Sequence, residues 1–278
     1  MKLKTVVHLG LGTAIFVSLS LPVEAGTVSP VQSTATPFGL DPVAPVQVTG
    51  SDDQAAAFNE NDLGTIRSLV NANLSERVEV DGIDTLALDT SSLVLSYPAD
   101  VRVYFVHEGA GYANSFGVYT GDPADGLSGD AALIFPNASS YNQTKGWISN
   151  RTPLLVGDFV DLGHMEEGTQ LNLFVISNGA NGGQNVYYTE QGLNSDGLEH
   201  FVALATDETD ALIIGVEDLP GGGDKDYNDV VVAVEMGAKN VQALASRAAP
   251  LPGPIFALSG LVLPLIRKRA GLRAKSKA

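Results

Sequence analysis

From Leu86 onward the chain consists of short segments rich in β-branched and aromatic residues, separated by turns rich in Gly, Asn and Asp. β-branched and aromatic side chains favour extended strands, whereas Gly, Asn and Asp favour tight turns. The segments follow one another without the intervening helices that link parallel strands. They are LVLSYP, VRVYFVHE, FGVYT, ALIFP, LNLFVIS, NVYYT, HFVALA, ALIIGVED and DVVVAVEM. We therefore expect eight or nine antiparallel strands in a mainly β fold, a β-sandwich or jelly roll.

The segment at 101–106 indicates how such a strand would lie. Two sets of side chains alternate along it, Val101, Val103 and Phe105 on one side and Arg102, Tyr104 and Val106 on the other. Successive side chains of a strand point to opposite faces of the sheet. This alternation predicts a half-buried strand.

Residues 52–75 have a different pattern, typical of helices. Asp52 and Asp53 can cap a helix N-terminus. Apolar residues then recur at near-helical spacing, at Phe58, Leu63, Ile66, Leu69 and Val70. The sequence predicts one or two short N-terminal helices here.

Residues 1–25 have the layout of a secretory signal peptide. Lys2 and Lys4 precede an apolar run from Val6 to Leu21, and Ala25 ends the segment. We expect export and cleavage after Ala25. The alternative is a retained membrane anchor, for which the apolar run is short.

Residues 250–278 form a second predicted targeting segment, after the signal peptide. A Pro-rich turn leads into an apolar stretch that ends at Ile266, directly before basic residues at 267–269. The uncharged stretch is marginally long enough to cross a bilayer as a helix, with the basic cluster on the cytoplasmic side. The arrangement resembles the PEP-CTERM sorting signal, which implies recognition by an exosortase-type enzyme and at least transient contact with the inner membrane. Gly253 stands where that family has Glu, and an ordinary transmembrane anchor is the alternative.

The region between the two ends is strongly acidic. Residues 26–254 hold eight basic and 31 acidic residues, a net charge of −23. Such a surface repels nucleic acid, so we expect no nucleic-acid partner. It suits divalent cations, although acidity alone also keeps an exported protein soluble. The absence of cysteine excludes disulfides, thiolate metal sites and a cysteine nucleophile.

The segment at 215–234, GVEDLPGGGDKDYNDVVVAV, concentrates oxygen-bearing side chains around three glycines. Asp224, Asp226 and Asn228 occupy alternate positions, and Asp229 follows directly. Oxygen ligands on alternate residues of a tight loop can converge on one hard cation, as in the first half of an EF-hand loop. The pattern therefore predicts a metal site, although it is not an EF-hand.

Two further acids, Glu217 and Asp218, end the preceding strand. A hairpin-like return is expected to bring at least one of them to the same ion. Many carboxylates in a flexible loop favour calcium over magnesium, and the lack of Cys and of a nearby His disfavours zinc. The alternative is a solvated acidic turn whose Asp and Asn side chains cap backbone amides.

The segments FVHEGAGYANSFGVYT at 105–120 and EDLPGGGDKDYNDVVVAV at 217–234 resemble the bacterial family known as domain of unknown function 4114, over about residues 80–236. The resemblance implies an all-β module of exported, surface or adhesin-like proteins, with cation binding and no assigned reaction. It adds Glu108, Tyr112 and Asn114 to the acids of the loop as candidate residues. Glu108 is expected either to ligate the ion or to cap a turn.

We therefore expect a signal peptide at 1–25, a linker or irregular segment at 26–50, a β-sandwich domain at 51–238, a linker at 239–249 and a sorting or transmembrane tail at 250–278. The expected function is that of a non-enzymatic protein of the cell surface or extracellular matrix, stabilised by calcium, with surface or matrix polysaccharide as a partner. One alternative is a calcium-dependent carbohydrate-binding lectin. Another is a glycan-cleaving enzyme with paired carboxylates.

Overall fold

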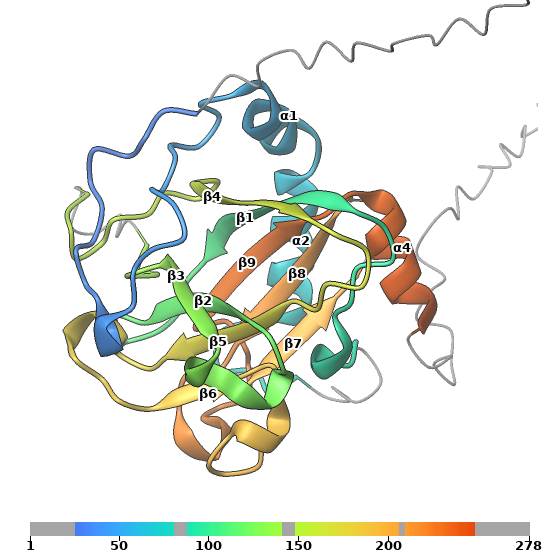
Figure 1. Cartoon of the computed structure of the whole chain (residues 1–278). Coiled ribbons are helices and arrows are strands. Elements are labelled where there is room, and N and C mark those ends of the chain that lie inside the picture. Colours follow the sequence, from blue (N-terminus) through green and yellow to red (C-terminus); the bar gives the residue numbers. More distant parts are fainter. Residues whose placement is uncertain (1–25, 81–87, 141–147, 206–208, 248–278) are drawn as a thin grey trace, which may run out of the picture.

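The computed structural model describes residues 26–80, 88–140, 148–205 and 209–247 (Figure 1). The expected signal peptide at 1–25 and the expected tail at 250–278 lie outside these ranges, so both stay predictions. Within the described ranges, no helix combines the length and the apolar character needed to cross a bilayer.

Two antiparallel sheets contain the nine strands of the described residues. The five-stranded sheet has the order β4 (Phe159–Met165), β1 (Ala99–His107), β9 (Val230–Glu235), β8 (Ala211–Val216) and β7 (Phe201–Leu204). The four-stranded sheet has the order β3 (Asp130–Phe135), β2 (Ser115–Thr120), β5 (Asn172–Ile176) and β6 (Val186–Tyr188). The predicted mainly antiparallel β fold is confirmed.

The two sheets share one core, as in a β-sandwich. Alternate side chains of each strand point into it, because successive residues of a strand face opposite sides. The five-stranded sheet contributes residues such as Val103, Phe105 and Val232, and the four-stranded sheet contributes Phe116 and Val175. All five are at most 1 % exposed, so the interior between the sheets is closed to water.

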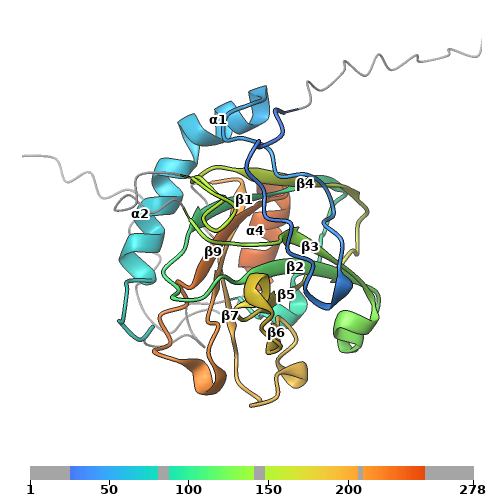
Figure 2. The same ribbon diagram turned by 90° about the vertical axis from the view of Figure 1, so that its left-hand side faces the viewer.

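Helices cover the outer face of the five-stranded sheet, which Figure 2 shows from the side. The predicted helices are α1 (Asp53–Asn61) and α2 (Leu63–Asn73), and Asp52 caps α1 by accepting a hydrogen bond from the Ala55 N–H at 2.7 Å. Their apolar stripe packs on the sheet, with the Phe58 ring stacked on Tyr104 at 3.7 Å between centroids. Helices here bury a face that a two-layer sandwich would leave to solvent.

This cover corrects the expectation for the strand at 101–106. Its side chains alternate as predicted, but Arg102, Tyr104 and Val106 are all buried as well. The Arg102 side chain can be buried because its charge is paired. Both of its Nη atoms donate hydrogen bonds to the Asp52 carboxylate at 2.9 Å, and its Nε donates one to Asp161 at 2.5 Å. The strand is fully buried because α1 and α2 pack on its second face.

The C-terminal segment expected to be a linker, 239–249, instead begins as a helix. Helix α4 runs from Ala238 to Arg247. Val241 and Leu244, three residues apart on one face, join the main core. Asn240 fixes the helix start by accepting hydrogen bonds from the Ser96 and Tyr97 N–H groups. The helix is therefore an integral part of the domain.

Two strand predictions also differ from the structure. The segment LVLSYP at 93–98 forms only a single bridge, between Val94 and Gln170, and follows a 3-10 turn. Strand β4 was not predicted, because it lies at the sheet edge and its outward residues, such as Asp161 and His164, are polar. The 3-10 turns of the described chain are η1 (Pro37–Gly39), η2 (Thr90–Ser92), η3 (Pro123–Ser128), η4 (Gly179–Asn181), η5 (Gln191–Leu193) and η6 (Pro220–Gly222).

Residues 26–50 are irregular, as expected, but they pack along the domain. Val46 belongs to the core between the sheets. Gln47 exchanges backbone hydrogen bonds with Phe159 of β4 at 2.8 and 3.1 Å. The chain at 41–43 bonds in the same way to Leu133 of β3, at 2.8 and 2.9 Å. This segment therefore spans both sheets.

Candidate metal centre

The acidic loop connects β8 to β9 at one end of the sandwich, at the bottom of Figure 1. Glu217 and Asp218 follow β8 directly, and η6 with Gly223 then reverses the chain. The return is held by the Asp229 N–H, which donates to the carbonyl of Val216 at 3.1 Å. Residues at the start and at the end of the loop are thus brought side by side, as the hairpin-like return predicted.

Five carboxylates converge there in two groups. Glu217, Asp224 and Asp226 form the first group, and Glu217, Asp218 and Asp229 form the second. In each group, one oxygen per residue lies within 4.8 Å of the others. Glu217 belongs to both. Asp229 shares one group with Asp218, whereas Asp224 and Asp226 share the other.

Burial makes the second group electrostatically costly. Glu217 and Asp218 are 1 % and 2 % exposed. Burial, with the neighbouring Asp229 carboxylate, raises the pKa of Glu217 to about 8. Burial, with the Asp218 carboxylate, raises the pKa of Asp229 to about 7. Burial also raises the pKa of Asp218. These shifts mean that the group favours a bound positive charge or a proton.

No lysine or arginine of the described ranges supplies that charge by an ion pair. The nearest candidate in sequence is Lys225, whose Nζ binds Glu79 at 3.0 Å. Backbone amides offer partial compensation, since Glu217 accepts from the N–H groups of Leu219 and Lys225 at 3.2 Å. A carboxylate has about four acceptor positions, so these bonds leave oxygen lone pairs for a cation.

The glycine at 223 is required by this packing. Its φ is +50°, and a Cβ on it would overlap the carboxylate of Glu217. The sequence suggested that the triple glycine turns the chain, and in the structure Gly223 has a second role. It gives the Glu217 carboxylate its place inside the loop.

Asp226 and Asn228 behave as the alternative prediction of a capped turn proposed. Asp226 accepts hydrogen bonds from the Arg77 N–H at 2.7 Å and from the Asn228 N–H at 3.1 Å. The Asn228 amide Nδ2 also donates to Asp226, at 2.9 Å. Its Oδ1 lies against Gly109. Asn228 thus holds Asp226 in position.

The first motif, at 105–120, contributes to the site through Asn114. Its Nδ2 donates to Asp218 Oδ2 at 2.6 Å, so this candidate positions a carboxylate of the second group. Glu108 accepts from the N–H and Oγ–H of Ser140, at 3.1 and 2.9 Å, which favours its turn-capping interpretation. Tyr112 is 45 % exposed.

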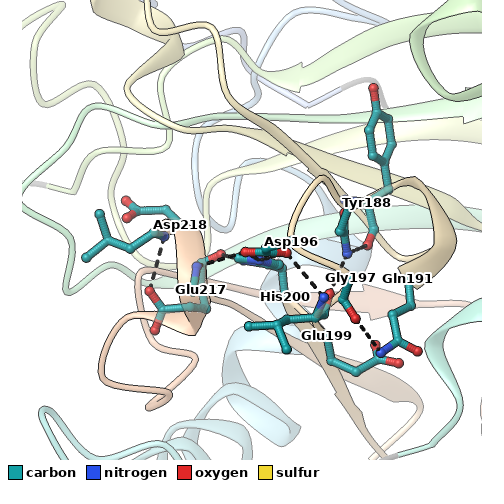
Figure 3. Close-up of polar contacts among 12 residues, drawn as sticks. Tyr188, Gln191, Asp196, Gly197, Glu199, His200, Glu217 and Asp218 are labelled. Carbon is teal, nitrogen blue, oxygen red and sulfur yellow. Dashed lines mark hydrogen bonds and ion pairs between the residues drawn. The ribbon is translucent and has the colours of Figure 1, made fainter.

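Sequence reasoning missed two residues next to Glu217, His200 and Asp196, which are drawn in Figure 3. The His200 ring is buried, stacks on Tyr187 at 3.7 Å, and contacts the Glu217 carbonyl through Nδ1 at 2.9 Å. Its Nε2 contacts Asp196, which accepts from the Gly221 N–H at 2.8 Å. The pairing of Phe201 with Val216 places His200 opposite Glu217, so a correct β7–β8 register would have revealed the contact.

Left-handed backbone conformations gather around the site. Five non-glycine residues of the described chain have positive φ. Lys225 and Tyr227 lie in the acidic loop itself, Arg77 donates its N–H to Asp226, and the Asn178 N–H donates to Asn114 at 2.9 Å. Such conformations are costly for residues with a Cβ and concentrate where function fixes the backbone.

Fold and site together define a mainly antiparallel β domain with an all-oxygen, carboxylate-rich loop at one end. Residues 165–237 match the family model of the domain of unknown function DUF4114. This match confirms the predicted resemblance for the part of the chain that contains both carboxylate groups. The segment at 105–120 precedes the matched range. Comparison with curated proteins and with solved structures gave no match.

Proposed function

We propose that this chain is an exported, non-enzymatic protein of the cell surface or extracellular matrix whose β domain is stabilised by calcium bound in the acidic loop. The observation that carries the proposal is the convergence of four aspartates on Glu217, with Glu217 and Asp218 almost fully buried. Carboxylates buried without a counter-charge destabilise a fold. A bound cation would convert that cost into a favourable interaction.

The donor set favours calcium among the common cations. All candidate ligands are carboxylate oxygens, on a loop with several flexible glycine positions. Calcium accepts six to eight oxygen ligands in irregular geometry, whereas magnesium demands a small octahedral shell. Zinc prefers nitrogen and sulfur ligands in its structural sites.

A stabilising role follows from where the ion would lie. The two groups join the end of β8 to the start of β9, which are neighbours at the centre of the five-stranded sheet. An ion that binds only the folded chain raises the free energy of unfolding by mass action. The burial of Glu217 and Asp218 also favours this role over direct coordination of a substrate.

Calorimetric calcium titration of the purified chain tests the proposal, together with thermal unfolding in calcium and in chelator. At a free calcium concentration of 100 times Kd, the gain of about 2.7 kcal/mol corresponds to a Tm rise of roughly 5–10 °C. Glu217→Gln, which removes a charge from both groups, should abolish uptake. Glu167→Gln, at an exposed acid away from the loop, is the matched control. Equal Tm values in calcium and chelator for the unsubstituted chain would refute the proposal.

The export part of the proposal rests on the sequence at 1–25 and 250–278. N-terminal sequencing of the chain recovered from the envelope or medium should begin at Gly26. Substitution of the apolar stretch before Ile266 should abolish membrane sorting without affecting calcium uptake. A chain that stays in the cytoplasm with Met1 intact would contradict this part alone.

A further inference from the structure

A polar pocket lies outside the metal centre, between the N-terminal segment and the loops of the four-stranded sheet. It encloses about 550 Å³, which is within the usual size range of small-molecule sites. Its lining residues include Ser33, Thr34, Ala113 and Asn181. Arg151 and its neighbour Asn150 also line it.

The lining suits a ligand that carries hydroxyl groups and a negative charge. Hydroxyl and amide side chains can each donate and accept hydrogen bonds. None of the pocket's lining residues in the described ranges is acidic, although the chain has twice as many acidic as basic residues, 32 against 16. The Arg151 guanidinium forms no ion pair or side-chain hydrogen bond within the described ranges, and a guanidinium fork matches the geometry of a carboxylate.

The structure fixes this arginine through a buried side chain. Asn137 is 3 % exposed. Its Nδ2 donates to the carbonyls of Asn150 and Arg151, at 3.4 and 3.2 Å, and its Oδ1 accepts from Ser139. The backbone that presents Arg151 is therefore held in place before any ligand arrives, which lowers the entropy cost of binding.

We propose that this pocket binds a carboxylate-bearing saccharide, a uronic-acid unit of a polysaccharide, with Arg151 on the carboxylate and the surrounding amides and hydroxyls on the sugar hydroxyls. This assignment gives the chemical class of the proposed polysaccharide partner. It deepens the proposed function and rests on it in part.

A chain of hydrogen bonds connects the pocket wall to the carboxylates. Asp218 accepts from Asn114 Nδ2 at 2.6 Å, and Asn114 Oδ1 accepts from the Asn178 N–H at 2.9 Å. Asn178 Oδ1 in turn accepts from the Ala113 N–H at 3.2 Å and from Asn181 Nδ2 at 2.9 Å. Ala113 and Asn181 are wall residues. An ion that fixes Asp218 would therefore also fix this wall, so calcium should strengthen saccharide binding.

The test is calorimetric titration of the full chain, in calcium and in chelator, with a glucuronate-containing tetrasaccharide. The same tetrasaccharide with its carboxylates reduced to alcohols is the matched ligand. We expect the acidic form to bind in calcium, and Arg151→Gln to weaken it by about tenfold, the size of one charge-assisted contact. Arg67→Gln, at an exposed arginine of α2, should leave binding unchanged. Asn114→Ala should weaken binding in calcium to the level seen in chelator.

The outcomes separate the two proposals. Calcium uptake without saccharide binding, or equal affinity for the acidic and reduced ligands, overturns the pocket assignment and leaves the metal centre standing. Saccharide binding that depends on Arg151 but is the same in calcium and chelator supports the pocket and overturns its connection to the ion. A chain that takes up no calcium while Arg151-dependent binding persists overturns the proposed metal function alone.

Discussion

The carboxylate of Glu217 occupies the space that a Cβ on Gly223 would need. This contact explains why the acidic loop can bury a glutamate that belongs to both carboxylate groups. The triple glycine therefore has two roles. It supplies left-handed backbone, and at Gly223 it leaves room for the Glu217 carboxylate.

Alanine substitutions in the triple glycine should distinguish these two roles. Gly221 has a φ of +78°, and a Cβ added to it would meet no atom within 4 Å, so Gly221→Ala should cost only the left-handed backbone, about 1–2 kcal/mol. Gly223→Ala adds displacement of Glu217 and should also abolish calcium uptake. Thermal unfolding and calcium titration of both variants provide the check, and equal calcium affinity for the two would argue against the contact.

The two carboxylate groups should contribute unequally to calcium affinity. Asp229 belongs to the buried second group and has a raised pKa, whereas Asp224 is exposed. We expect Asp229→Asn to weaken calcium binding by about 100-fold or more, beyond the cost typical of outer-shell partners. Asp224→Asn should cost less than about tenfold. The reverse order, measured by calorimetry, would place the ion in the first group.

Calcium should flatten the pH dependence of stability. The pKa values of Glu217 and Asp229 are raised in the folded chain, to about 8 and about 7, so folding favours their protonated forms. In chelator, stability is therefore greatest below the ordinary carboxyl pKa of these groups and is lost as the pH rises through about 7 to 8. Calcium competes with the proton, so its affinity should rise over the same interval. Tm measured between about pH 5 and pH 8 tests this. The slope in chelator should shrink in Glu217→Gln, and a flat profile for the unsubstituted chain would contradict the raised pKa values.

The buried Arg102 should be one of the most sensitive positions away from the loop. Its guanidinium binds Asp52 and Asp161 and lies 4.1 Å from the Phe159 ring centroid. Arg102→Met leaves the buried Asp52 carboxylate without its partner, which typically costs about 3–5 kcal/mol. Denaturant unfolding should show this loss, with partial recovery in Arg102→Met/Asp52→Asn. Arg67→Met on exposed α2 surface is the control, and a similar loss there would mean that the effect is not specific to the buried pair.

Local patterns were sufficient to predict most of the fold. Segments rich in β-branched and aromatic residues identified eight of the nine strands in the described ranges, and helical spacing identified α1 and α2. Strand β4 was missed because an edge strand can carry Asp161, Gly163 and His164 without an apolar pattern. Helix α4 was missed because only Asn240, Val241 and Leu244 are buried along its length.

The carboxylates of the candidate site were predictable from the sequence, but their arrangement in two groups was not. The run of acids after β8 is visible in the sequence, and the hairpin return follows from strand pairing. The supporting contacts join residues far apart, such as Asn114 with Asp218, 104 positions away, and Arg77 with Asp226, 149 positions away. Contacts of this range depend on how the two sheets and α2 pack, which local patterns do not specify.

The irregular segment at 26–50 covers part of one outer strand of each sheet. Strands β4 and β3 are the outermost strands of their sheets, and an unpaired outer strand is a template on which another chain can add. The backbone bonds of Gln47 to Phe159, and of residues 41–43 to Leu133, occupy part of both templates with a segment too irregular to propagate a sheet. A Pro-rich stretch of this kind limits the backbone groups of β4 and β3 that remain open to pairing with another chain.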